Sequence, residues 1–153
     1  MDIDIVQFFN KFPQALPLYL AFEEMIRMKY PGIKIKVQKS QISISNKHAF
    51  AFVWLPIRKM KNRPDVYIIV SFALSYQLSS SRIVQSVEPY PNRWTHHVII
   101  QDINEIDLEL MNWINEAYEF AMTKDQVSDK RWLLKLIYRD IYNCSRIPYN
   151  FIV

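Results

Sequence analysis

Glycine is nearly absent from this chain, which has only Gly32 among its 153 residues. Average usage of about 7% would supply roughly eleven. The phosphate-binding loops of P-loop NTPases and of Rossmann dinucleotide-binding domains depend on clustered glycines, because only glycine lets the backbone approach the phosphates closely. The scarcity of glycine therefore excludes both of these enzyme classes.

Cysteine is equally scarce, and Cys144 alone cannot form an intramolecular disulfide. The acidic start, Met1–Asp4, lacks the basic region and the apolar core of a secretory signal. The strongest apolar run, residues 66–74, is interrupted by Ser71 and is far shorter than the roughly 18 residues that cross a bilayer. We therefore expect a cytoplasmic protein without a membrane span.

Recognisable catalytic and metal-binding motifs are also missing. The sequence has no GxSxG elbow, no HExxH pair and no Ser-His-Asp set at a known spacing. Its three histidines and one cysteine show no ligand-like spacing, so we expect no metal and no cofactor. Glu116 and Glu119 share the polar side of a predicted helix, where carboxylates are usually solvated. These absences favour a non-catalytic protein over an enzyme.

The hydrophobic pattern is rich enough for one domain, since 50% of the residues are hydrophobic and 14% are aromatic. Apolar spacings of three and four residues predict two N-terminal helices, broken around Pro13 and Pro17. Period-two alternation and apolar runs predict strands over residues 33–37, 41–45, 49–55, 66–74, 83–87 and 95–101. A capping box of Asp102 and Glu105 precedes an apolar helical stripe from Ile106 to Ala121. The predicted fold class is therefore α+β, a single antiparallel β-sheet of about five to six strands packed by N- and C-terminal helices. Each of the first two strands is expected to have one solvated face.

The chain is expected to form a single α+β domain over residues 1–123 and a C-terminal helical extension over residues 124–153. The extension contains a predicted helix, residues 132–141, that is apolar over more than one face. Such a helix needs cover on two sides, so the extension either wraps its own domain or meets another copy. The second alternative predicts a homodimer through residues 130–153.

Aromatic residues recur along the predicted strand 49–55, where Phe50, Phe52 and Trp54 should share one face. If exposed beside lysines, these rings could stack nucleic-acid bases. If covered by the 106–121 helix, they belong to the core. We favour burial, because aromatic residues mostly pack.

Basic residues are concentrated between Arg27 and Arg63, where the chain has ten of them and no Asp or Glu, while the remainder has fifteen acids and nine bases. This distribution predicts a positive potential on one side of the protein, which would attract phosphates or acidic partners. The candidate anion-binding residues are Lys34, Lys36, Lys47, Arg58, Lys59, Lys61 and Arg63. Alternatively, the acidic segment 102–129, with eight carboxylates and one lysine, neutralises the basic region within the fold or between subunits.

A second candidate site is a pocket around His96. Alternation places His96 and His97 on opposite faces of strand 95–101, so they cannot hold one metal ion together. The candidate pocket residues are Lys39, Tyr90, Arg93, Trp94 and His96. In this pocket His96 would act as a proton shuttle or as a hydrogen-bond donor to a small anion, with Lys39 as a fixed cation. Alternatively, His96 is a structural histidine that bonds to a backbone group at the sheet margin.

Several stretches follow one another along the chain: Lys39-Ser40-Gln41-Ile42, Phe50-Ala51-Phe52-Val53, Arg93-Trp94-Thr95-His96-His97-Val98, and Ile106-Asp107-Leu108-Glu109-Leu110 with Trp113, Ala117 and Tyr118. Together they resemble a bacterial family catalogued as a domain of unknown function. The resemblance covers residues 13–122 and implies a helix, an antiparallel sheet and a closing helix that ends in an Ala-Tyr pair. Some members carry the label "predicted transport protein". Ile99 departs from a position that tends to be polar in the family, and residues 124–153 have no counterpart in it.

The function predicted from these features is that of a non-catalytic binding domain whose basic surface binds an anionic partner such as nucleic acid. Two alternatives stay open. One is a small-molecule-binding or hydrolytic pocket around His96 and Lys39. The other is a self-associating structural protein that pairs through its C-terminal extension.

Overall fold

In the computed structural model, which describes residues 2–123, helices precede and follow one antiparallel sheet. The elements are α1 (Ile3–Phe8), η1 (Pro13–Ala15), α2 (Leu16–Lys29), β1 (Lys34–Val37), β2 (Gln41–Ser45), β3 (Ala49–Trp54), β4 (Ile68–Leu74), β5 (Ile83–Tyr90), β6 (Arg93–Ile100), η2 (Ile103–Glu105) and α3 (Leu108–Met122). The predicted α+β class is confirmed. The predicted helical extension 124–153 and the homodimer contact through residues 130–153 lie outside the described residues.

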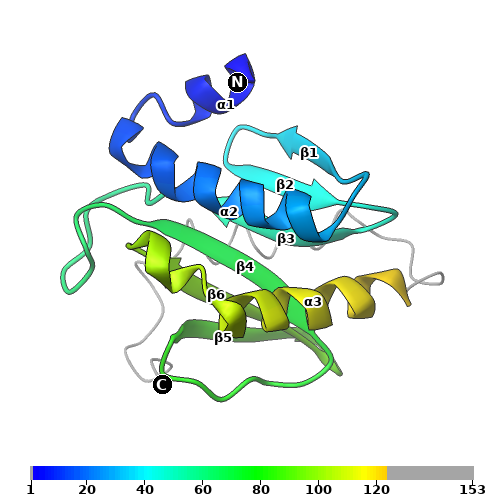
Figure 1. The fold of residues 1–153 in the computed structure, drawn as a ribbon. Coiled ribbons are helices and arrows are strands. Elements are labelled where there is room, and N and C mark those ends of the chain that lie inside the picture. Colours follow the sequence, from blue (N-terminus) through cyan, green and yellow to red (C-terminus); the bar gives the residue numbers. More distant parts are fainter. Residues whose placement is uncertain (1, 124–153) are drawn as a thin grey trace.

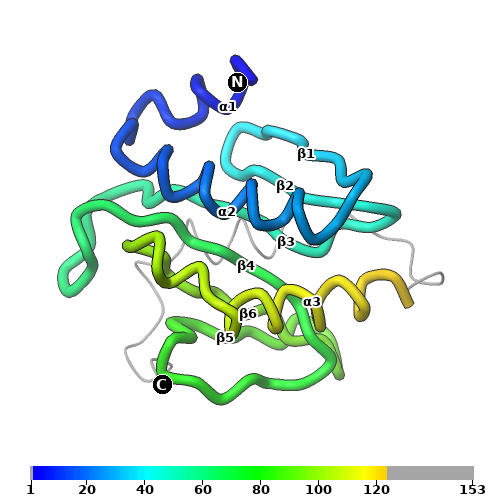
Figure 2. The backbone as a smooth tube through the Cα atoms, viewed as in Figure 1, coloured from blue at the N-terminus to red at the C-terminus, as the bar shows by residue number. Residues whose placement is uncertain are grey.

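The six strands have the order β1-β2-β3-β4-β6-β5, so the chain leaves the centre of the sheet after β4, forms the edge strand β5 and returns as β6. The backbone path shows this crossover and the β5–β6 hairpin that follows it (Figure 2). Helices α2 and α3 lie across the same face of the sheet (Figure 1). We call this the helix face, and the opposite side of the sheet the second face.

The main hydrophobic core lies between the helices and the helix face. Alternate residues of β4, from Ile68 to Leu74, project into it, and Phe72 is fully buried there. Phe22 of α2 and Leu110 of α3 supply the helical side, and both are also fully buried. Each such side chain contributes roughly 1.5 to 3 kcal/mol through burial, so the helix stripes that the sequence predicts hold the layers together.

An extra residue in β3 changes which aromatic rings meet the helices. The register between β2 and β3 shifts at this point, and Phe50 is the additional residue on β3. Phe50 therefore joins the core of the helix face, with its ring centre 5.3 Å from that of Tyr30, whereas Phe52 and Trp54 pack on the second face. The prediction that the three rings are buried is confirmed. The prediction that they share one face is wrong, because the bulge reverses the alternation.

The second face is lined by polar residues that are nonetheless buried. Gln41 and Ser43 of β2 are buried there, so the expected solvated face of this strand is wrong. One polar group of each side chain has a local acceptor: Gln41 Nε2 donates to Gln38 Oε1 at 2.7 Å, and Ser43 Oγ donates to the Lys36 carbonyl at 3.4 Å. Gln41 Oε1 is buried and has no hydrogen-bond partner among the described residues. Alternation alone could not reveal this burial, because short polar side chains with nearby acceptors can occupy a covered face.

The capping box of Asp102 and Glu105 is present, as predicted, but it starts a different element. It opens the short helix η2, and α3 begins later, at Leu108. Asp107 is the N-cap of α3 and accepts a hydrogen bond from the Leu110 N–H at 3.0 Å. Two successive caps therefore turn the chain from the end of β6 onto the helix face.

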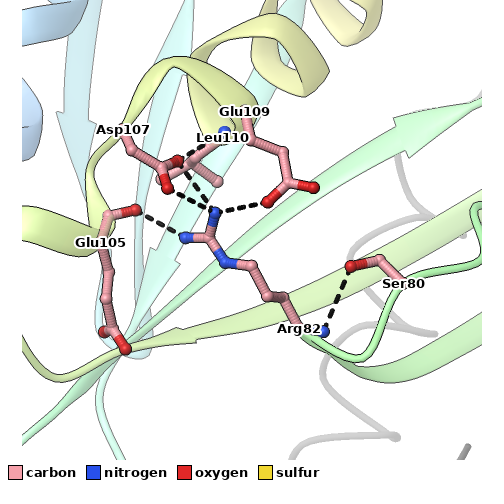
Figure 3. Close-up of polar contacts among 6 residues, drawn as sticks. All are labelled: Ser80, Arg82, Glu105, Asp107, Glu109 and Leu110. Carbon is pink, nitrogen blue, oxygen red and sulfur yellow. Dashed lines mark hydrogen bonds and ion pairs between the residues drawn. The ribbon is translucent and has the colours of Figure 1, made fainter.

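Arg82 fixes the crossover between β4 and β5 to the start of α3 (Figure 3). Its Nη1 donates to both carboxylate oxygens of Asp107, at 2.8 and 3.0 Å, and to Glu109 Oε2 at 2.9 Å. Its Nη2 donates to the Glu105 carbonyl at 2.6 Å. Partial burial raises the pKa of Asp107, but the Leu110 N–H and the Arg82 guanidinium outweigh it, so the pKa lies below its usual value. Arg82 thus holds two parts of the chain that are distant in sequence.

Candidate anion-binding site

The loop over residues 55–67, between β3 and β4, carries four of the predicted anion-binding residues. They are Arg58, Lys59, Lys61 and Arg63. Proline at both Pro56 and Pro64 removes backbone donors, which prevents the segment from continuing either strand. Asn62 adopts a left-handed conformation with φ 65°, which Asn tolerates better than most residues, and the Arg63 N–H donates to the Met60 carbonyl at 3.3 Å. The local sequence therefore forms a turn over residues 60–63, which contains Lys61 and Arg63 and directly follows Arg58 and Lys59.

A small cavity lies where this loop meets the second face of the sheet, with a volume of about 60 Å³. Its sheet side includes the apolar residues Ile69 and Ile99 together with the polar residues Gln85 and His97, and the loop contributes the two arginines, Arg58 and Arg63. A space of this size holds a few water molecules or one small anion. It is much smaller than the ~300 to 1,000 Å³ typical of pockets for drug-sized ligands.

His97 is the buried polar ring of the cavity, and Ser71 holds it in place. These residues pair across β4 and β6, and the Ser71 Oγ lies 2.6 Å from His97 Nδ1. Burial, together with the adjacent His96, lowers the pKa of His97 to about 4, so its imidazole is neutral at physiological pH. Because Nδ1 is engaged by Ser71, Nε2 is the ring nitrogen left for a ligand.

The arginines of the cavity lack acidic partners within residues 2–123. No carboxylate in this part of the chain forms an ion pair with Arg58 or Arg63, whereas Lys59 Nζ lies 2.6 Å from Asp65 Oδ1 at the exposed surface. Arg63 is half-buried, which weakens solvent screening of its charge, and Arg58 is exposed. Two uncompensated guanidinium groups beside a neutral hydrogen-bonding ring form an arrangement suited to an anion.

The other predicted anion-binding residues do not all join this loop. Lys34 and Lys36 lie on the edge strand β1, where register with Ser45 and Ser43 places them toward the second face. Four strands separate β1 from β5. Lys47 lies in the β2–β3 turn, at the opposite end of the sheet from the 55–67 loop. Lys61 is exposed on the loop itself. The basic run is therefore divided between both ends of the sheet.

The structure does not gather the residues of the predicted His96 pocket. Lys39 precedes β2 and lies at the end of the sheet where β3 leaves into the 55–67 loop, because Gln41 pairs with Trp54. Tyr90 and Arg93 pair with each other at the opposite end, where β5 turns into β6. Trp94 lies one residue further, opposite Leu74 of β4. Lys39 and the hairpin residues are thus separated by the length of the sheet.

His96 itself is fully buried on the helix face. Its Nε2 accepts a hydrogen bond from the Leu78 N–H at 2.8 Å, and its ring stacks on Phe72 with the ring centres 5.4 Å apart. Burial lowers the pKa of His96 to about 4, although its interaction with the Phe72 backbone opposes this shift. This geometry matches the alternative in which His96 is a structural histidine that bonds to a backbone group, which here belongs to the crossover loop.

Sequence reasoning did not select Ser71, Gln85 or His97 as site residues. The available signal was Ser71, a polar residue in the middle of a strand that is otherwise apolar on both faces. Its partner could be found only from the register of β4 with β6. Arg58 and Arg63 were predicted, because their charge is visible in the sequence.

Among residues 2–123, no three His, Cys, Asp or Glu side chains come together in a way that could hold a metal ion. The helices in the same part of the chain are too short or too polar to cross a membrane.

Comparison with protein families gives a match. A family model described as "Domain of unknown function (DUF5655)" matches residues 5–121. Comparisons with curated proteins and with solved structures find no match. The resemblance to a domain of unknown function is therefore confirmed, over a range close to the one that the sequence motifs indicate.

Proposed function

Because the chain belongs to this family, whose function is unknown, we propose a role from its candidate site: a non-catalytic binding domain that holds an anionic partner, nucleic acid first among them, through the 55–67 loop. A single observation carries the proposal. Arg58 and Arg63 lie together on the loop, border one cavity and have no carboxylate partner within residues 2–123. Nucleic-acid binding of this kind depends on phosphate contacts from such cations.

The position of Lys39 supports the same surface. It lies at the end of the sheet from which the loop departs, so it can add a positive charge beside those of the loop. The buried state of Phe52 and Trp54 argues against base stacking on β3, so contacts to phosphates would dominate. The lone cysteine still favours a cytoplasmic setting. A role for residues 130–153 in pairing two copies stays a prediction.

Removing the two loop arginines tests the proposal. We expect the full chain to bind labelled single-stranded and duplex oligonucleotides at low salt, and the Arg58→Gln/Arg63→Gln variant to bind at least about tenfold more weakly, because each lost charge-assisted bond costs ~1.5 to 3 kcal/mol. On duplex, affinity should fall by about 0.9 log unit per log unit of salt for each phosphate contacted, and the variant should show a smaller slope. Fluorescence anisotropy over a salt series measures both quantities.

The matched control is Lys34→Gln/Lys36→Gln, which removes the same charge from the second face at a distance from the cavity. It should keep most of the affinity. If both double variants weaken binding equally, net charge and not the loop explains the attraction. If the unmodified chain binds no oligonucleotide at low salt, nucleic acid is not the partner.

A further inference from the structure

We propose that the cavity under the 55–67 loop receives a terminal phosphate monoester, the phosphorylated end of its ligand. The inference rests on the proposed function in one respect, since both place the ligand at this loop. It adds the chemical group that is recognised and the residues that recognise it. The size of the cavity, its charge and its donors all favour this group.

The size of the cavity admits an end group only. About 60 Å³ is close to the space of a few water molecules and far below that of a nucleoside. A phosphate within a nucleic-acid chain carries a sugar on two sides, and both would have to enter with it. A terminal phosphate has one attachment, so it can enter while the remainder of the ligand stays on the loop surface.

The charge of the cavity matches a dianion. Arg58 and Arg63 border it from the loop, and neither has an acidic partner within residues 2–123. A phosphate monoester carries a charge close to −2 at neutral pH, whereas an internal phosphodiester carries −1. Guanidinium groups also present their donors in a planar fork that fits the oxygens of a phosphate.

The sheet side of the cavity supplies neutral donors. His97 and Gln85 are register partners on β6 and β5, and both line the cavity. An anion in the cavity favours the tautomer in which His97 keeps its proton on Nε2 and Ser71 donates its O–H to Nδ1, 2.6 Å away. The cavity then offers two guanidinium groups, an imidazole N–H and a side-chain amide. A phosphate end presents three oxygens to these four groups, and a carboxylate presents only two.

One oligonucleotide sequence, prepared with a 5′-phosphate, with a 3′-phosphate and without a terminal phosphate, tests the inference on the full chain. At near-physiological salt, we expect at least one phosphorylated form to bind about tenfold more tightly than the unphosphorylated form, as measured by anisotropy. The gain in affinity comes from the charge-assisted hydrogen bonds that the terminal phosphate adds. Inorganic phosphate should compete with that form. It should also raise the thermal midpoint above the value in sodium chloride of equal ionic strength.

A double variant, Ser71→Ala/His97→Phe, distinguishes binding in the cavity from binding to the charges of the 55–67 loop. It removes the donor and its buried partner together, so no buried polar atom loses a partner, and it keeps all loop charges. It should lose the preference for the phosphorylated end while its binding of the unphosphorylated oligonucleotide and its salt dependence stay unchanged. If its unfolding transition shows that it does not fold, Gln85→Leu serves instead and should reduce the same preference.

Equal binding of all three oligonucleotides, with no effect of inorganic phosphate, would overturn the inference and leave the proposed function standing. A preference that survives in the Ser71→Ala/His97→Phe variant and in Gln85→Leu would also overturn it. Binding of inorganic phosphate without binding of any oligonucleotide would support the cavity assignment for a small phosphorylated ligand and remove nucleic acid as the partner. The two proposals can therefore fail separately.

Discussion

Lowering the pH from 7 to 5 is expected to destabilise the folded domain by about 4 kcal/mol, about 2 kcal/mol for each of two buried histidines. His96 and His97 are both buried, and burial lowers the pKa of each from 6.5 to about 4. In the unfolded chain both rings take up protons near their ordinary pKa. The folded state cannot do so at pH 5 without losing stability, since the charged rings would lie in the core.

The sign of this effect follows from proton uptake. Between the lowered pKa of about 4 and the ordinary value of 6.5, the unfolded state binds more protons than the folded state. Stability is therefore highest above 6.5 and decreases as the pH falls toward 4, below which both states are protonated and this contribution changes no further. Urea unfolding at a series of pH values measures the slope.

Two single substitutions assign the slope to its residues. His96→Gln can keep an acceptor for the Leu78 N–H, and His97→Asn can keep a partner for Ser71. Each variant should lose about half of the pH dependence between pH 7 and 5, whatever its stability at pH 7. A slope that persists in both variants would assign acid sensitivity to other groups.

Replacing Arg82 by Met is expected to lower the free energy of unfolding by about 2 kcal/mol. The substitution removes the bonds to Asp107, Glu109 and the Glu105 carbonyl, and it also removes a guanidinium placed 5.5 Å from the centre of the Trp113 ring. The expected loss exceeds that of a usual surface ion pair because one side chain serves several acceptors with short bonds. It is limited by exposure, since the Arg82 side chain is 23% exposed and those of its two acidic partners are about half exposed.

Arg27→Met is the matched control. Arg27 forms one ion pair with Glu23, at 2.7 Å within a single helix, and its side chain is 52% exposed. Its loss should cost ~0.5 kcal/mol or less. Arg82→Lys should recover only part of the stability, because an ammonium cannot reproduce the fork of bonds. Equal midpoints for Arg82→Met and Arg27→Met in urea unfolding would show that the crossover is not held by this side chain.

The fold class could be predicted because apolar periodicity follows burial directly. The period-two segments and the stripe from Ile106 to Ala121 correspond to elements of the structure, and the Asp102–Glu105 capping box is present. The distribution of aromatic rings could not be predicted. The bulge at Phe50 adds one residue to β3 without a local signature, and one residue is enough to exchange the faces of a strand.

The candidate site was only partly visible in the sequence for a similar reason. The charges of Arg58 and Arg63 belong to the residues themselves, so the basic run pointed to them. The cavity depends on how the loop returns over the sheet and on the register that brings Ser71 opposite His97. The sequence places His96 in a candidate pocket with Tyr90, Arg93 and Trp94, but the crossover loop bonds to its ring and the helix face covers it.

The two margins of the sheet have a consequence for contacts between molecules. In the described part of the chain, β1 and β5 are the outer strands, and each would leave backbone donors and acceptors open to a strand of a second molecule. β1 is only four residues long and carries Lys34 and Lys36, while β5 contains Pro89 and two register shifts. Charge, proline and irregular pairing each disfavour growth of a continuous sheet between molecules. The lysines of β1 therefore have a protective use that does not require a ligand, and their removal would make aggregation through this strand easier.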